Sequence, residues 1–311
     1  MTARTRALDP SGVQAEAAAR SRPVRWLAAV LETARPRQWP KNLLVFAAPL
    51  AGASMGRDKG FGYTLGTTAA FVVASAAVYF VNDVIDANRD RLHPVKRLRP
   101  VPSGRLPAAH ALAIAAIAAA LAGSYGFWFG QPRLAGLITA YMAISLLYGL
   151  VLKHVPVIEM LAVASGFVLR ALGGAVATNV PPSGWFLLVC CLGALMVAIA
   201  KRYSELTSLG AEAARHRPVM RRYTRAWLRR SQRLTAVVMV MAYLLWAAGE
   251  SGGWIRGWHL ASAVPLIAAL WRFDWLSGRV DGRPVEDLIS RDYPMVGAEL
   301  AWLVLFVVGL L

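Results

Sequence analysis

Residues 65–90 read LGTTAAFVVASAAVYFVNDVIDANRD, an apolar run followed at once by a polar run rich in aspartate. The part from Leu65 to Val81 carries no charge and is close to the roughly 20 apolar residues that a helix needs to cross a bilayer. If the helix continues, Asn82, Asp86 and Asp90 recur every four positions and share one face, with Asp83 beside them. The stretch predicts a membrane helix that ends in a carboxylate-bearing face.

The composition is that of an integral membrane protein. The 311 residues are 57% hydrophobic and 16% charged, whereas soluble domains contain about 25% charged residues. The 34 Lys and Arg residues outnumber the 17 Asp and Glu residues, which gives a net charge of +17. Only two cysteines are present, which excludes a disulfide-stapled secreted module. The aromatic residues gather near the ends of apolar runs and not between basic residues, so nucleic-acid binding is not indicated.

Nine apolar segments have about the length of a membrane span, which predicts an all-α protein with nine transmembrane helices. They are Trp39–Met55, Leu65–Val81, Ala108–Phe129, Leu134–Leu152, Val157–Ala177, Trp185–Ala200, Leu234–Ala248, Trp254–Trp271 and Pro294–Leu311. With the N-terminus inside, 29 of the 34 basic residues fall on the inner side, as the positive-inside rule requires. The segment Val24–Ala34 is predicted to be a helix along the membrane surface, and residues 1–23 a disordered basic tail without chemistry. Residues 24–311 are expected to form a single transmembrane domain.

The aspartate face predicts a cation site. Like charges stacked on one helical face repel by a few tenths of a kcal/mol per pair, so they call for compensation. Oxygen ligands without nearby His or Cys suit Mg²⁺, which takes one or two carboxylates and completes its shell with water and substrate phosphates. We expect Asp83, Asp86 and Asp90 to be the ligands. The alternative is that these carboxylates pair with Arg89, Arg91 or Lys96.

The loop that follows, RLRPVPSGRL at residues 97–106, combines rigid prolines with Arg97, Arg99 and Arg105. Several guanidinium groups on a rigid loop can hold a phosphorylated substrate. Taken alone, however, a basic run at a membrane surface is typical of a topology determinant or of a contact with anionic lipids.

The motif NDVIDANRD with the loop after it resembles the first aspartate-rich motif of the UbiA superfamily of intramembrane transferases. The YGLVLK run, which contains Tyr148 and Lys153, resembles the tyrosine-lysine element of that superfamily. The resemblance implies a nine-helix bundle in which Mg²⁺ binds a diphosphate leaving group at a cavity that opens to the cytoplasm. It implies that Asn82 and the three aspartates are catalytic and that Tyr148 and Lys153 bind substrate.

Two further stretches are similar to one branch of that superfamily, the actinobacterial decaprenyl-phosphate phosphoribosyltransferases. The run RPRQWPKN begins at Arg35, and KRYSEL at Lys201 stands where other members carry a second aspartate-rich motif. This resemblance implies that both stretches supply substrate contacts, namely Arg37, Gln38, Lys41, Asn42, Lys201, Arg202, Tyr203 and Glu205. Lys41, Lys201 and Arg202 are expected to clamp phosphates.

The reaction implied by the branch is Mg²⁺-dependent transfer of 5-phosphoribose from phosphoribosyl pyrophosphate to a polyprenyl (decaprenyl) phosphate, releasing pyrophosphate, for a cell-wall arabinan precursor. The expected location is the inner membrane of an actinobacterial-type cell, with the site in the cytoplasm. The nearest alternative is a superfamily prenyltransferase that moves an isoprenoid from its diphosphate to an aromatic acceptor; a transporter is the alternative from another class. The oligomeric state is left open, a homo-oligomer included.

Two ionisable residues lie within the fifth predicted span. Arg170 is costly in hydrocarbon and must face the bundle interior or a polar cavity, and Glu159 lies about three turns earlier on the same face. We expect Arg170 to contact a substrate phosphate; the alternative is that each residue pairs with another helix. Glycines in apolar helices usually permit close helix packing, which we expect of Gly52, Gly62, Gly66 and the pair Gly173 and Gly174.

Overall fold

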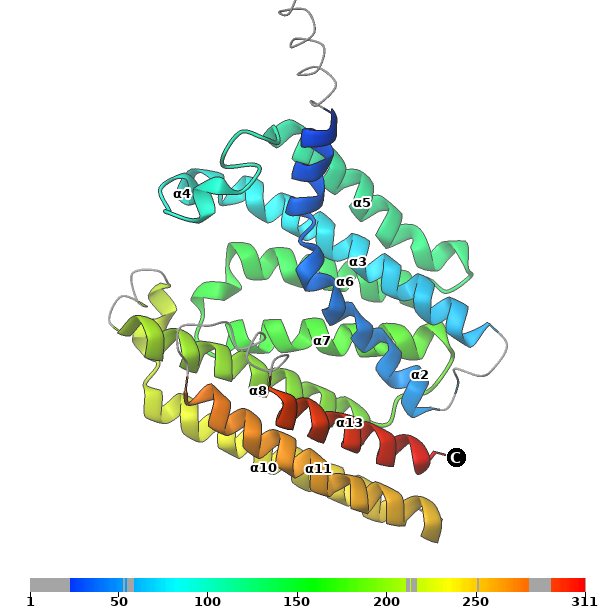
Figure 1. Ribbon diagram of the computed structural model, residues 1–311. Helices are drawn as coiled ribbons and strands as arrows, with labels where there is room; N and C mark the ends of the chain where they lie inside the picture. The colour runs from blue at the N-terminus through cyan, green and yellow to red at the C-terminus, as the bar shows by residue number, and fades with distance from the viewer. Residues whose placement is uncertain are drawn as a thin grey trace, which may run out of the picture. The chain divides into compact units, whose positions relative to one another are not determined.

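The computed structural model describes residues 23–52, 54, 59–210, 213, 217–250, 252–279 and 292–310, and in these ranges the regular structure is helical (Figure 1). The basic tail expected at residues 1–23 therefore lies almost entirely outside the described residues. The chain divides into two compact units, one of residues 1–40 and 72–123 and one of residues 41–71 and 124–311. Each unit is described by itself.

The first unit contains a helix at residues 23–33, which agrees with the helix predicted before the first span. It also contains the last part of α3 (Gly60–Ile85), then α4 (Ala87–Arg91), η2 (Lys96–Leu98) and most of α5 (Ala108–Trp128). Its core joins side chains from these elements, with Ala29, Phe80, Leu106 and Ala111 all buried. The N-terminal helix thus packs against the aspartate-bearing end of α3 and against the loop that follows.

The second unit is a helical bundle in which helices that follow one another in the chain also pack against one another. Its main elements are α2 (Ala47–Ala51), α6 (Pro132–Leu150), η3 (Leu152–His154), α7 (Ile158–Ala177), α8 (Gly184–Leu209), η5 (Pro218–Arg222), α10 (Arg225–Gly249), α11 (Gly253–Ser277) and α13 (Tyr293–Val308). Helix α6 packs against α7, α7 against α8, α8 against α10, α10 against α11, and α11 against α13. Figure 1 shows α10, α11 and α13 lying side by side.

Local signals in the sequence explain where several of these helices begin. Ser183 accepts a hydrogen bond from the Phe186 N–H before α8, and Thr224 accepts one from the Trp227 N–H before α10. Asp292 caps α13 in the same way, through the Met295 N–H. Such side chains satisfy backbone donors that have no partner inside the first turn. Hydrogen bonds from Arg272 lower the pKa of Asp292, so this cap stays ionised at neutral pH.

Six described helices are long and apolar enough to span a membrane: α3, α5, α6, α7, α8 and α10. The helix α13 is apolar but has 16 residues. Each predicted span overlaps helical structure in the residues that the structure describes, but the first differs from the expected α-helix. There the chain forms η1 (Pro36–Phe46), a 3-10 helix that contains Pro40, followed by the short α2. Proline lacks the N–H that an α-helical bond needs, which interrupts regular α-helix at this point.

Close packing explains four of the five glycines singled out from the sequence. A Cβ on Gly174 would collide with the Val45 carbonyl, one on Gly173 would lie 2.5 Å from the Phe71 ring, and Gly52 and Gly66 are blocked by side chains. The expectation was wrong for Gly62, where no atom of the described residues lies within 4 Å of an added Cβ. Gly174 therefore lets η1 approach α7 to backbone contact.

We expect Gly174→Ala to destabilise the protein by about 1–3 kcal/mol, because the added methyl group meets backbone that cannot rotate away. Gly136→Ala in α6 is the matched control, since nothing lies within 4 Å of that position and alanine favours a helix by up to about 1 kcal/mol. The measurement is thermal unfolding in detergent. Equal melting temperatures of the Gly174→Ala variant and the wild type would contradict this account of the α7 packing.

Candidate active site

The predicted aspartate face is present in the first unit. Backbone hydrogen bonds from Asp86 to Asn82 (2.9 Å) and from Asp90 to Asp86 (2.8 Å) carry the helical repeat from α3 into α4. Asp83 and Asp90, two turns apart, are 2% and 3% exposed, whereas Asn82 and Asp86 are half-buried. The two most buried carboxylates therefore lie on one side of this helical segment.

Two arginines bind these carboxylates. Arg35 pairs with Oδ1 of Asp83, and Arg99 lies 3.7 Å from the same oxygen and 2.6 Å from Oδ2 of Asp90. The guanidinium of Arg35 also lies 4.8 Å from the centre of the Tyr79 ring. The carboxylates thus pair with cations, as the alternative from the sequence supposed, although the partners are Arg35 and Arg99. These contacts use one oxygen of each carboxylate.

The remaining arginines expected at this site are more exposed. Arg105 forms a bidentate pair with Glu32 of the N-terminal helix, at 2.8 and 2.9 Å. Both side chains are 48% exposed. Arg37 and Arg97 are exposed, and Gln38 is half-buried. Arg99 is therefore the arginine of this loop that contacts the aspartates.

The donor set of the first unit fits Mg²⁺. A single guanidinium lies within ion-pair distance of both Asp83 and Asp90, so this position already favours a positive charge. Within the part of the chain that the structure describes, no group of three His, Cys, Asp or Glu side chains could hold a metal, so a cation here would have two carboxylate ligands from the protein. Two carboxylates with a completing substrate phosphate is the arrangement that Mg²⁺ commonly takes in phosphate-handling sites.

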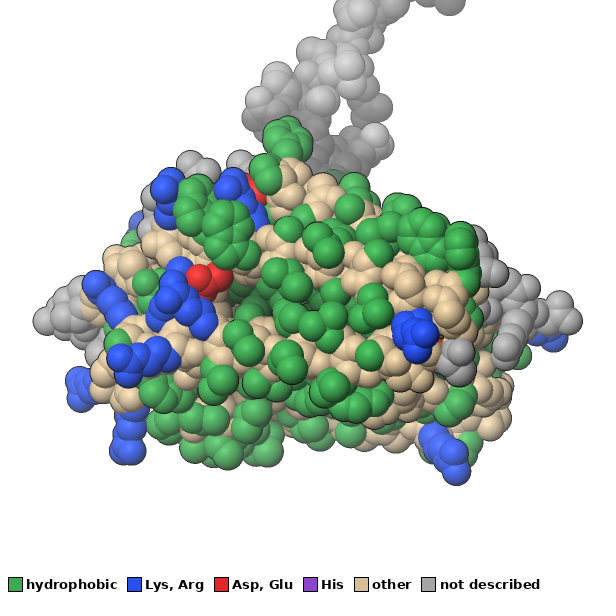
Figure 2. Space-filling model, turned by 90° about the horizontal axis from the view of Figure 1, so that it is seen from below, with side chains coloured by type: hydrophobic (Ala, Val, Ile, Leu, Met, Phe, Trp, Pro, Cys, Tyr) green, Lys and Arg blue, Asp and Glu red, His purple; other side chains and the backbone are tan. Residues whose placement is uncertain are grey.

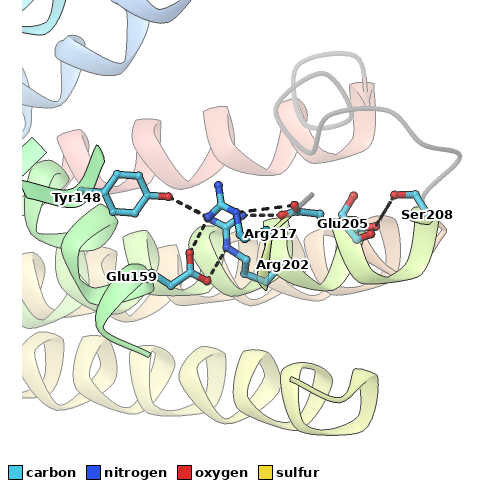
Figure 3. A network of polar contacts seen from close by, with 7 residues as sticks. Tyr148, Glu159, Arg202, Glu205, Ser208 and Arg217 are labelled. Carbon is cyan, nitrogen blue, oxygen red and sulfur yellow. Dashed lines mark hydrogen bonds and ion pairs between the residues drawn. The ribbon is translucent and has the colours of Figure 1, made fainter. Parts of the chain in front are cut away.

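The second unit contains a buried ionic network, which Figure 3 shows. Glu159 of α7 is fully buried and accepts hydrogen bonds from Arg202 of α8 and from Arg217, each at 2.8 Å. Arg202 also donates to Glu205 at 2.7 Å, and the Tyr148 hydroxyl accepts from both arginines, at 3.3 and 3.1 Å. The negative charges of the two carboxylates balance the positive charges of the two guanidiniums. The hydrogen bonds of this network connect the ends of α6, α7 and α8.

A strained turn positions Glu159. Val157, just before α7, has a φ of 65°, a conformation that is unusual for a β-branched residue. Its N–H donates to the Tyr223 hydroxyl at 2.8 Å, and burial raises the pKa of Tyr223, so that this hydroxyl stays protonated at neutral pH. Tyr223 thereby fixes the start of α7 two residues before Glu159.

Arg170 is held by other protein groups. Its Nε donates to Asn42 of η1 at 2.7 Å, and its two terminal nitrogens donate to the Gly166 carbonyl at 2.7 Å and the Tyr141 hydroxyl at 2.8 Å. Arg170 and Asn42 are both buried. Arg170 and Glu159 therefore pair with different elements, as the alternative from the sequence supposed. The phosphate contact expected for Arg170 stays a prediction.

The other residues expected to bind substrate in this unit are half-buried. Lys41 lies in η1, Lys153 in η3, and Lys201 and Tyr203 near the end of α8. The guanidinium of Arg229 lies 5.4 Å from the centre of the Tyr203 ring. Lys201 and Tyr203 therefore flank Arg202, which binds Glu159.

Sequence reasoning missed three residues that organise these clusters: Arg35, Arg217 and Tyr141. The sequence indicated a role for Arg35, because Arg35 is the first residue of the RPRQWPKN stretch, but only other residues of that stretch were assigned a role. Arg217 was one of many cations in a basic loop, and Tyr141 lies within an apolar span. For these two the local sequence contains no sign of a distant buried partner.

The second unit also contains a cavity of 1110 Å³ lined by about forty residues of η1, α2, α7, α8, α10, α11, α13 and the loop before α8. Its walls are mostly apolar, with Phe167, Trp185, Trp246, Leu303 and Phe306 among them. Pockets for drug-sized molecules are about 300–1,000 Å³, and this cavity is slightly larger. Its size and its apolar lining suit a long hydrocarbon ligand.

The described residues thus combine six helices that are apolar enough to span a membrane with a buried aspartate pair in the first unit and a large apolar cavity in the second. Residues 43–284 match the family model described as the UbiA prenyltransferase family. The chain belongs to this family.

Among curated relatives, the decaprenyl-phosphate phosphoribosyltransferase of Mycobacterium tuberculosis is 38% identical over 288 residues, which cover 90% of this chain and 94% of the relative. The enzyme of the same name from Corynebacterium glutamicum is 36% identical, covering 88% and 84%. A UbiA homologue from Archaeoglobus fulgidus, solved with GPP and Mg²⁺, has a TM-score of 0.67 at 15% identity and covers 91% of this chain and 98% of its own. A digeranylgeranylglyceryl phosphate synthase has a TM-score of 0.66 at 18% identity, with the same coverage. These two structures support the fold.

Proposed function

We propose that this protein transfers 5-phosphoribose from phosphoribosyl pyrophosphate to decaprenyl phosphate and releases pyrophosphate. The observation that carries the proposal is the similarity, over nearly the whole chain, to relatives named decaprenyl-phosphate phosphoribosyltransferase. The site chemistry agrees with it, because both substrates are anionic and the protein carries a net charge of +17. A basic surface raises the local concentration of anionic substrates.

In this proposal the carboxylates of the first unit bind the pyrophosphate end of the donor through a divalent cation. Asp83 and Asp90 would hold Mg²⁺, with Asp86 and Asn82 beside them on the same turns. When bound, Mg²⁺ supplies positive charge to the leaving pyrophosphate. Arg35 and Arg99 orient the two aspartates, since each guanidinium binds a carboxylate oxygen directly.

The second unit argues for a donor other than a simple prenyl diphosphate. At the end of α8, where other family members carry a second carboxylate motif, Arg202 lies between Glu159 and Glu205. Arg217 completes this charge-balanced network, and the half-buried Lys201 adds a positive charge beside it. We assign this cluster to the 5-phosphate of the donor, the group that a prenyl diphosphate lacks.

The acceptor needs a site for its isoprenoid chain and no activating base. The apolar cavity of the second unit would receive the chain. A phosphate monoester has a second pKa near 6, so the acceptor oxygen already carries charge at neutral pH. That oxygen attacks C1 of the ribose as the bond to pyrophosphate breaks, which inverts the configuration at C1. The task of the protein is to position two anions, which alone can supply much of the rate.

We further propose the topology predicted from the charge pattern: nine transmembrane helices in one domain of residues 24–311, a cytoplasmic N-terminus and a cytoplasmic site. The helices α11 and α13 and the segment η1–α2 would join the six apolar helices as the remaining spans. The first 23 residues would remain a basic cytoplasmic tail.

A transfer assay tests the function. Purified protein in detergent with Mg²⁺ receives labelled phosphoribosyl pyrophosphate and decaprenyl phosphate, and label is counted in the organic phase. A parallel reaction contains labelled geranyl diphosphate and an aromatic acid. Label in the lipid phase of the first reaction is expected. Product in the second reaction alone would replace the proposal with aromatic prenyl transfer.

Lys201→Ala is expected to raise the KM for phosphoribosyl pyrophosphate by about tenfold while changing kcat little, because a contact present in both ground and transition states contributes to binding alone. Lys96→Ala is the matched control, since Lys96 is an exposed lysine of the first unit's basic loop. Steady-state kinetics with varied donor measure both constants. An unchanged KM would remove Lys201 from the donor site.

A further inference from the structure

A second recess lies between α8, α10 and α11 and shares Met196 and Leu270 with the wall of the large cavity. It has a volume of 510 Å³. One end is apolar, with Val237, Val240, Met241, Ile267 and Trp271 among its walls, and the other end is lined by Gln232, Arg233 and Asp274. Figure 2 shows a face covered mostly by hydrophobic side chains, with a hollow and with Lys and Arg gathered toward one end beside an acidic side chain. The recess is therefore amphipathic along its length.

The polar end has an excess of positive charge. Arg229 and Arg233 both bind Oδ2 of Asp274, at 3.0 and 3.2 Å, so two cations share one carboxylate. The Arg233 side chain remains 63% exposed. Arg225 and Arg230 lie on the same first turns of α10. An anionic group that reaches this end meets a guanidinium that can donate to it.

The side chain of Gln232 adds a second requirement for a ligand of this recess. It is 1% exposed, and its Nε2 donates to Ser277 at 2.8 Å and to Asp274 at 3.2 Å. Its Oε1 is buried and has no hydrogen-bond partner among the described residues. A buried carbonyl oxygen without a donor is costly, so the complementary ligand carries an O–H or N–H group close to its anionic group.

The length of the recess matches one leaflet of a membrane. From Gln232 to Met241 the helix rises about 14 Å, at 1.5 Å per residue. The hydrocarbon core of a bilayer is about 30 Å thick, so this distance is about half of it. The polar end lies at the arginine-rich start of α10, where a headgroup would lie if α10 spans the membrane.

We propose that this recess binds a phospholipid with an anionic headgroup that also carries hydroxyl groups. Arg233 receives the phosphate, the headgroup hydroxyl donates to Oε1 of Gln232, and one acyl chain lies along Val237, Val240 and Met241. The polar end of this site is distinct from the proposed transfer site, because Gln232 and Arg233 do not line the large cavity and have no role in the reaction. The proposal therefore stands or fails independently of the proposed function.

Native mass spectrometry of the full-length protein in detergent tests this site, with dioleoyl-phosphatidylglycerol and dioleoyl-phosphatidylcholine as probes. The wild type is expected to retain phosphatidylglycerol in preference to phosphatidylcholine. Arg233→Gln is expected to reduce that preference about fivefold, which is the typical effect of one arginine near a membrane surface. Val237→Trp, at a position that is 59% exposed, is expected to lower the retention of both lipids by filling the apolar end.

Arg256→Gln is the charge-matched control, because Arg256 is exposed near the other end of α11 and does not line the recess. Size-exclusion profiles verify that each variant is folded. Equal retention of the two lipids by the wild type, or an unchanged preference in Arg233→Gln, would overturn the proposal. So would a change of oligomeric state in Val237→Trp without any change in lipid retention, since that result identifies the face as a contact between copies of the chain.

Discussion

Asp83→Asn is expected to lower phosphoribosyl transfer by on the order of a hundredfold or more while the protein remains folded. The substitution keeps the size of the side chain and removes the negative charge that would hold Mg²⁺ and the pyrophosphate, a class of contact whose loss typically costs two to three orders of magnitude. Arg35 and Arg99 are each about one-third exposed, so water can solvate them when their partner is neutral. The measurement combines the transfer assay with thermal unfolding in the presence of Mg²⁺ and pyrophosphate.

The thermal readout separates a role in metal binding from a structural role. Because a ligand that binds the native state raises the melting temperature, the wild type should be stabilised by Mg²⁺ with pyrophosphate and the variant should not. Glu32→Gln is the control, because it removes a carboxylate of the same unit whose ion pair with Arg105 is half exposed and contributes at most about 1 kcal/mol. Full activity of Asp83→Asn with Mg²⁺ would remove Asp83 from the site.

Glu159→Leu is expected to destabilise the protein by about 3–5 kcal/mol, the typical cost of removing one partner from a buried ion pair. Glu159 is fully buried and binds two arginines, and Arg202 has a side chain that is only 9% exposed. Without Glu159, two guanidiniums keep a single carboxylate partner, Glu205. The apparent melting temperature in detergent should fall by several degrees.

The double variant Glu159→Leu with Arg202→Met separates loss of charge pairing from loss of packing. A buried ion pair replaced by apolar side chains often recovers stability, so the double variant should melt above Glu159→Leu. It should not recover transfer activity, because Arg202 is proposed to contact the donor. A single variant that melts like the wild type would show that the network of Figure 3 does not hold the helices.

Patterns of local sequence predicted the helices and the aspartate face. Both depend on short-range regularities: the length of an apolar run, as in α3, and a four-residue spacing, as from Asn82 to Asp90. The same reasoning placed Glu159 and Arg170 in the bundle interior, because charged side chains are excluded from hydrocarbon. The burial of Asp83 and Asp90 relative to Asp86 did not follow from spacing, since it depends on which side the N-terminal helix and the basic loop cover.

The partners of the charged residues could not be predicted in this way. Arg35 and Asp83 are 48 positions apart, and Arg217 and Glu159 are 58 apart. From the sequence alone, many arginines could pair with each carboxylate, and tertiary packing decides which of them does. The 3-10 geometry of η1 was missed for a different reason: Pro40, which lacks the N–H of a regular α-helix, lies inside the first predicted span, and its effect was not considered.

The central claim is that the chain joins a sugar phosphate to a lipid phosphate. The most direct test is mass spectrometry of the lipid that the purified protein forms from phosphoribosyl pyrophosphate, decaprenyl phosphate and Mg²⁺. The account predicts decaprenyl phosphate extended by one phosphoribosyl group, formed by the wild type and absent with Asp83→Asn. A lipid product without the added phosphate, or unchanged decaprenyl phosphate while the same preparation prenylates an aromatic acid, would contradict it.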